Sequence, residues 1–375
     1  MTDDGVKTLL WVLHQAQLGL AAFLEVLGVS SWPFSHRLAA EQLLFDRGQA
    51  ARVVLAALAI VALLLILAVA LWWRKRPRRL LVLGALAILI ALFTPWPIWR
   101  LLLTPTVPTA FHASAVPFNA SAVMQGRQLY QAHCLRCHGA LGDGDGVDAD
   151  KQAIWPPTLN RSILWRRFEG ELFWSVRHGM TDRHGAVTMP AADALMTDEQ
   201  IWMVLGFVRA QAAGQSLKRE GVWEFPVALP DEAVRCAGRG PGSQRLDALR
   251  GQTVRLVFAG DTMVREDPRM VTVSVGETQG IDCTSDSAEM RRALSILLGV
   301  EDGQLGGYQI LVDRQGWLRA QSKPGSSGWS EDDLVCRTAD TLQISKPASE
   351  ADGLQALIRR MDAEPVRAVV AGFSH

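Results

Sequence analysis

Cys134-Leu135-Arg136-Cys137-His138 decides how the middle of this chain folds, and the sequence is read outward from it. The two cysteines are three residues apart, so both thiols can reach the two vinyl groups of one haem, and the histidine that follows can ligate its iron. A zinc or thioredoxin-like site is the alternative, but the sequence lacks a second cysteine pair at zinc-ligand spacing. The motif predicts one covalently attached haem c, held by Cys134, Cys137 and His138.

A second axial ligand is expected downstream of the motif. The candidates there are His178, Met180, His184 and Met189. Residues from about 126 to 211 resemble a class I cytochrome c domain, in which a Met followed directly by Pro ligates the iron, and Met189-Pro190 matches that pattern. The resemblance implies Met189 as the metal ligand, and a thioether in that position raises the reduction potential.

The segments around the motif have recognisable local signals. A helix is expected over 121–133, and a second begins after Thr197, which can cap it together with Gln200. Residues 170–178 predict a short helix that Gly179 ends. The acidic, glycine-rich run 139–146 lacks the spacing of a calcium loop, and Trp155-Pro156-Pro157 resembles the segment that accepts a hydrogen bond from the proximal histidine in this family.

The N-terminal part is strongly apolar. Residues 53–73 carry no charged side chain and are long enough to cross a membrane, and a second apolar stretch covers about 80–99. Five Lys and Arg residues within 74–79 indicate that this loop is cytoplasmic. Residues from 104 onward are therefore expected in the periplasm, with the anchor in the bacterial inner membrane. A third stretch, about 8–29, either spans or lies flat at the interface, since His14, Gln17 and Glu25 form a polar stripe.

The C-terminal part predicts a small α/β domain. Strands are expected at 254–258 and 271–275, a helix around 288–298, and a hairpin formed by 308–313 and 317–320. This order of elements, together with the sequence of residues 311–316, resembles a thioredoxin-like fold with fewer elements than usual. The segment lacks the CxxC motif of that fold. The remaining cysteines, Cys236, Cys283 and Cys336, allow one disulfide in any of three pairings, and a structural bridge is preferred over a metal or redox site.

The chain is therefore expected to be multidomain, with 375 residues and 38 basic against 38 acidic side chains. This balance gives no indication of nucleic-acid binding. The expected parts are N-terminal transmembrane helices at 1–103, a linker at 104–120, an all-α class I cytochrome c domain at 121–215, a linker at 216–234, and the thioredoxin-like domain at 235–375.

The expected function is transfer of single electrons, as a carrier rather than an enzyme, between redox donor and acceptor proteins. Membrane lipid and further subunits of a membrane complex are the other expected partners. The layout, with Cys137-His138-Gly139 and 170–174, also resembles cytochrome fusions of the copper-resistance D family. That resemblance implies an alternative, a copper-homeostasis or redox-sensing membrane protein that uses the haem.

Overall fold

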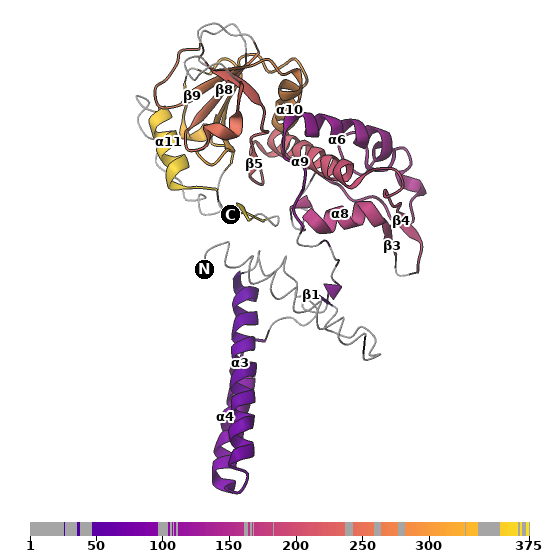
Figure 1. Cartoon of the computed structure of the whole chain (residues 1–375), viewed down its shortest axis with the longest axis vertical. Helices are drawn as coiled ribbons and strands as arrows, with labels where there is room; N and C mark the ends of the chain where they lie inside the picture. The colour runs from indigo at the N-terminus through magenta and orange to yellow at the C-terminus, as the bar shows by residue number, and fades with distance from the viewer. Residues whose placement is uncertain are drawn as a thin grey trace. The chain divides into compact units, whose positions relative to one another are not determined.

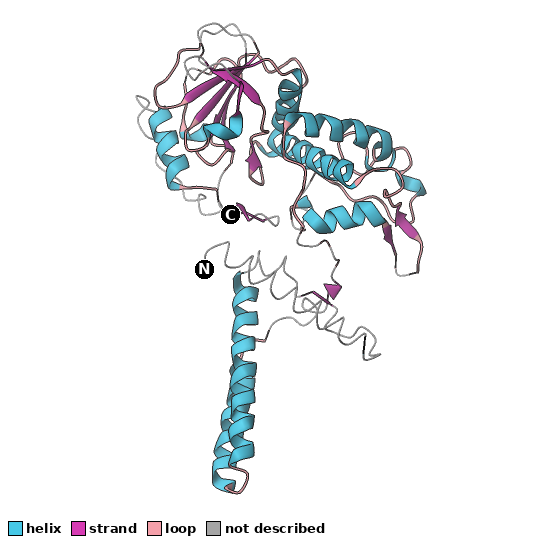
Figure 2. Ribbon diagram, viewed as in Figure 1, coloured by secondary structure: helices cyan, strands magenta, loops and turns pink. Residues whose placement is uncertain are grey.

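The computed structural model divides into two compact units, residues 1–108 and 109–375. It describes residues 26, 36–37, 47–96, 104–105, 107, 109, 112–160, 164–165, 167, 169–182, 184–236, 243–258, 264–276, 281, 283–326, 328–336, 353–366, 368–369 and 373–374. The expected span at 8–29 lies outside these ranges except for Val26. Figures 1 and 2 show the described elements.

The first unit contains two helices that lie against each other, α3 (Arg47–Trp72) and α4 (Pro77–Phe93). Among the described residues one helix, over Val54–Trp72, is long and apolar enough to cross a membrane. Helix α4 begins with a proline, as first helical positions allow, and ends six residues earlier than expected, because Pro95 and Pro97 follow. The short strands β1 (His36–Arg37) and β2 (Thr104–Pro105) pair antiparallel.

Four helices and a hairpin form the first half of the second unit, here named the helical domain. These elements are α6 (Ala120–His133), α7 (Leu135–His138), η2 (Ala149–Lys151), α8 (Glu169–His178), β3 (Met180–Thr181), β4 (Val187–Met189) and α9 (Asp198–Glu220). The predicted helices at 121–133 and 170–178 are confirmed. The predicted cap of α9 is also confirmed, since Thr197 and Gln200 form a capping box.

Helices α6 and α9 cross at close range. Gly126 makes this approach feasible, because a Cβ at that position would overlap the backbone carbonyl of Met203 and crowd Phe207. One turn later on α6, the ring of Tyr130 packs against Phe207 with 5.4 Å between centroids. The crossing fixes the end of α6, which leads directly into Cys134.

An eight-stranded mixed sheet with two helices forms the second half, here named the sheet domain. The strands follow the order β5-β12-β11-β8-β9-β10-β6-β7, with β8, β9 and β10 parallel to one another and the other pairs antiparallel. The elements are β5 (Val227–Ala228), β6 (Ala233–Cys236), β7 (Ser243–Arg245), η4 (Leu246–Leu249), β8 (Val254–Phe258), β9 (Val271–Val275), β10 (Cys283–Ser285), α10 (Ala288–Leu298), β11 (Gln309–Val312), β12 (Trp317–Ser322), η5 (Glu331–Asp333), α11 (Gly353–Ala363), β13 (Ala368–Val369) and β14 (Phe373–Ser374).

The predicted strands, helix and hairpin of this domain are confirmed, and a sheet-rich C-terminal half is present. Its thioredoxin-like identity stays a prediction. Successive side chains of β11 point to opposite faces of the sheet. Ile310 packs in one hydrophobic cluster with α10, and Leu311 packs in a second cluster with α11.

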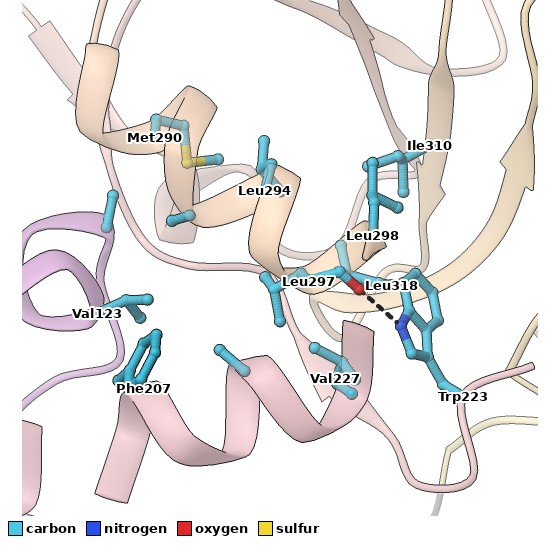
Figure 3. Packing of buried hydrophobic residues seen from close by; sticks show 14 of the residues in the cluster. Val123, Phe207, Trp223, Val227, Met290, Leu294, Leu297, Leu298, Ile310 and Leu318 are labelled. Carbon is cyan, nitrogen blue, oxygen red and sulfur yellow. Dashed lines mark hydrogen bonds between the residues drawn. The ribbon is translucent and has the colours of Figure 1, made fainter. Parts of the chain in front are cut away.

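The helical and sheet domains share one hydrophobic core. Phe207 on α9, Leu297 on α10 and Leu318 on β12 belong to a single buried cluster (Figure 3). Trp223 closes it, and its indole nitrogen donates a 3.1 Å hydrogen bond to the Leu297 carbonyl. A Cβ at Gly214 would overlap the Ile296 carbonyl, so α9 meets the end of α10 backbone to backbone.

The expected linker at 216–234 differs from the structure. Helix α9 continues to Glu220 because its first stop signal is Gly221, which adopts the left-handed conformation with φ 74°. Val227 and Ala228 then pair with β12 as the edge strand β5. This segment is part of the shared core rather than an open connection.

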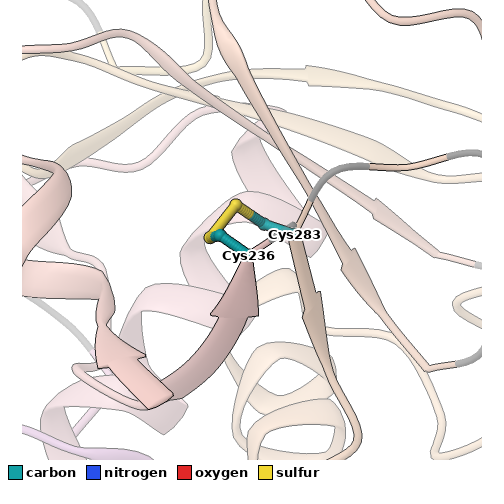
Figure 4. Close-up of a disulfide and its surroundings, with 2 residues drawn as sticks. All are labelled: Cys236 and Cys283. Carbon is teal, nitrogen blue, oxygen red and sulfur yellow. A yellow bond between two sulfur atoms is a disulfide. The ribbon is translucent and has the colours of Figure 1, made fainter. Parts of the chain in front are cut away.

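One of the three open cysteine pairings is present. Cys236 on β6 and Cys283 on β10 face each other across the sheet and form a disulfide (Figure 4). Cys336 keeps a fully buried free thiol. The expectation of one disulfide among these cysteines is confirmed, its structural role stays a prediction, and the pair could not be chosen from the sequence.

Candidate haem site

The three motif residues share one face of a single helical turn. Helix α6 ends at Cys134, and α7 follows at once, with the His138 amide bonded to the Cys134 carbonyl at 2.9 Å. Residues three and four apart lie on the same side of such a turn. Both cysteines are half-buried and free of disulfides. This arrangement presents two thiols and an imidazole together, which fits covalent attachment and ligation of one haem.

The glycine-rich loop folds back onto this turn. The Gly144 amide donates to the His138 carbonyl at 2.9 Å, and the Gly146 amide donates to the Cys137 carbonyl at 3.2 Å. A Cβ atom at Gly146 would overlap the Arg136 backbone. A Cβ atom at Gly144, which has φ 82°, would overlap the Pro156 carbonyl in the same way. These hydrogen bonds and close backbone approaches hold the glycine-rich loop against the motif.

The imidazole of His138 lies in a buried environment beside Pro157. Burial lowers the pKa of His138, and the Pro157 carbonyl opposes this shift as a backbone hydrogen-bond acceptor. Within the described part of the chain, Nδ1 is buried and has no partner at full hydrogen-bond geometry. A histidine held neutral beside a backbone carbonyl, with a buried ring nitrogen that lacks a hydrogen bond, is suited to ligate a metal.

The thiols differ in their surroundings. Burial, followed by the charge of Cys137, raises the pKa of Cys134 to about 11, so this thiol is protonated at neutral pH. The amide of Gln152 lies 3.4 Å from the Cys137 sulfur. Beside the motif, Asp148 accepts 2.5 Å hydrogen bonds from both Arg136 and Lys151.

The candidate second ligands lie on and around the β3–β4 hairpin. Met180 and Met189 are cross-strand partners, the former 43% exposed and the latter half-buried. His178 ends α8 with its ring 4.0 Å from that of Trp174, and exposed His184 occupies the hairpin turn. The structure brings Cys134, Cys137 and His138 together, while ligation by Met189 stays a prediction.

Two supporting residues were not identified from the sequence. Tyr130 is 2% exposed and donates a 2.8 Å hydrogen bond to the Gly139 carbonyl directly after the motif. Gln211 on α9 donates to the Ala140 carbonyl at 2.7 Å. Tyr130 lies four residues before Cys134 on the same helix, which was the available signal. Nothing local marks Gln211.

The comparison with family models decides the identity of this region. The family described as "Cytochrome C oxidase, cbb3-type, subunit III" matches residues 121–208. The helical domain contains a cytochrome c domain. Haem binding and haem-based electron transfer follow from this family.

Individual relatives match only part of this chain. A thiosulfate dehydrogenase from Allochromatium vinosum is 38% identical over 91 residues, which are 23% of this chain and 30% of that protein. A solved reducing HAO-like protein complex from Kuenenia stuttgartiensis matches 28% of this chain and 49% of its own, at 20% identity and a TM-score of 0.22. This chain therefore spans less than a third of the thiosulfate dehydrogenase.

Proposed function

We propose that the chain is a membrane-bound c-type cytochrome that carries one covalently attached haem and transfers single electrons on the periplasmic side of the inner membrane. The observation that carries this proposal is the placement of Cys134, Cys137 and His138 on one helical turn. When bound, the haem iron supplies reversible one-electron oxidation and reduction.

The protein residues have separate roles in this proposal. Cys134 and Cys137 would form the thioether links, and His138 and Met189 would ligate the iron. The Pro157 carbonyl would help to orient the imidazole. An iron held by two protein side chains would favour electron transfer over oxygen or peroxide chemistry.

Membrane attachment is supported by helix α3. Its leucines are widely exposed, with Leu64 at 60% and Leu65 at 62%. Such a continuous apolar surface is unfavourable in water and matches the interior of a bilayer. The basic loop 74–79 supports the orientation with α6 and everything after it in the periplasm.

The similarity to thiosulfate dehydrogenase covers only 30% of that protein, so we propose a carrier that exchanges electrons with separate donor and acceptor proteins. Stoichiometric haem reduction by thiosulfate alone would instead favour an enzyme. The copper-homeostasis alternative stays a prediction. Copper sensitivity of a deletion strain with unchanged respiration would favour it.

The test is retention of haem after denaturation of the purified full-length protein. We expect a c-type optical spectrum and haem staining on a denaturing gel. The double variant Cys134→Ala/Cys137→Ala should lose the stain, whereas Cys336→Ala, which changes a cysteine in the sheet domain, should keep it. Stain retained by the double variant, or absent from the wild type, would refute covalent attachment.

A further inference from the structure

A mostly apolar cavity of about 480 Å³ lies in the second unit, between the helical and sheet domains. It is lined by α6, α8 and α9, the segment 113–118, the segment 225–228, and single residues of α10 and β12. None of Cys134, Cys137 and His138 lines it. Its volume falls in the range of small-molecule sites.

Flat aromatic side chains form much of the wall. Trp165 and Phe225 stack with ring centroids 4.9 Å apart. Trp202 and Trp317 also line the cavity. Walls of this kind favour a planar ring that can stack on them.

An ion pair stands in this wall. Arg209 forms an ion pair with Glu169 and lies over the Trp165 ring at 5.3 Å. The side chains are only 17% and 23% exposed. Burial lowers the pKa of Arg209 to about 10, so the guanidinium remains charged at neutral pH and the pair is neutral overall.

The pair leaves donor capacity on the guanidinium. One terminal nitrogen donates to Glu169 and the other donates to the Leu164 carbonyl, whereas the Nε atom has no exposed surface. Each terminal nitrogen carries two N–H groups, and the Arg209 side chain lines the cavity, so a ligand acceptor can bind a remaining N–H group.

These features define the chemistry of the occupant. It is planar, because the walls are aromatic. It is neutral, because a carboxylate would meet Glu169 as a like charge. It also carries a hydrogen-bond acceptor for Arg209 and an apolar remainder. We propose that the cavity binds the head group of a quinone, whose ring carbonyl accepts a hydrogen bond from the Arg209 guanidinium.

The experiment is isothermal titration calorimetry of the full-length, haem-containing protein in detergent micelles, with decylubiquinone as the probe and protein-free micelles as the blank. The wild type should bind one equivalent. Gly206→Leu should abolish binding, because Gly206 lines the cavity and a leucine side chain there would fill part of it. The helix should accept this leucine, since an added Cβ atom at position 206 would be 3.9 Å from Phe118.

Arg209→Lys keeps the charge beside Glu169 but replaces the planar guanidinium by a single ammonium group, and should weaken binding by roughly tenfold or more. The control for Gly206→Leu is Ala363→Leu, which introduces leucine at an exposed position at the end of α11. This variant should bind the quinone as the wild type does. The optical spectrum of each sample reports the haem site separately, so loss of haem is distinguished from loss of the quinone site.

Three results would overturn the proposal. They are no saturable heat with the wild type, undiminished binding by Gly206→Leu, and tighter binding of dodecanoate than of decylubiquinone. The last result would identify an anion site.

Discussion

Met189 and Met180 face each other across one hairpin, yet only Met189 is proposed to reach the iron. Met189→Ala should abolish the near-infrared band of methionine-ligated ferric haem and lower the reduction potential, because a thioether ligand favours the reduced iron. The matched variant Met180→Ala should keep the band. Loss of the band in Met180→Ala alone would reassign the ligand.

Gly126 and Gly206 are helix glycines in different surroundings. Gly126→Ala should lower the free energy of unfolding by about 2 kcal/mol or more, because its Cβ would press on the Met203 backbone. Gly206→Ala should be neutral or raise it by up to about 1 kcal/mol, because alanine favours a helix and its Cβ has room. Urea denaturation followed by circular dichroism measures both. Equal stability of the two variants would contradict the close crossing of α6 and α9.

At the scale of elements, the Cys236–Cys283 bridge joins the edge hairpin β6–β7 to the parallel strands. Replacing both cysteines by alanine should reduce the free energy of unfolding by about 4 kcal/mol, as expected from the chain entropy of a loop this long. The control Cys336→Ala removes a buried thiol that makes no disulfide, and should cost on the order of 1 kcal/mol. A double variant no less stable than this control would show that the bridge is not structural.

Local signals explain why so many elements could be predicted. Thr197 with Gln200 marks the start of α9, and the apolar run 254–258 marks β8, because caps and periodicity act within a few residues. The cysteine pair and the order of the strands depend on contacts between distant segments. For the same reason the haem motif could be recognised while the contact from Gln211 could not.

At the scale of the whole molecule, the boundary after Pro108 separates the apolar unit from the proposed haem carrier. Residues 109–375, exported behind a cleavable signal peptide, should be soluble in the periplasm and retain covalent haem. Centrifugation of a periplasmic extract and haem staining measure this. The same chain with Cys134→Ala/Cys137→Ala should be free of stain. Soluble protein that never acquires haem would mean that maturation requires the first unit.

The backbone contact of Gly214 with the end of α10 leaves no room for a side chain at position 214. The core that the helical and sheet domains share makes separate movement of either domain costly. A redox partner that recognises one place on the sheet domain would therefore sit at a constant distance from His138. Electron tunnelling rates fall steeply with distance, so the rigid contact between the domains would keep the transfer rate to that partner constant.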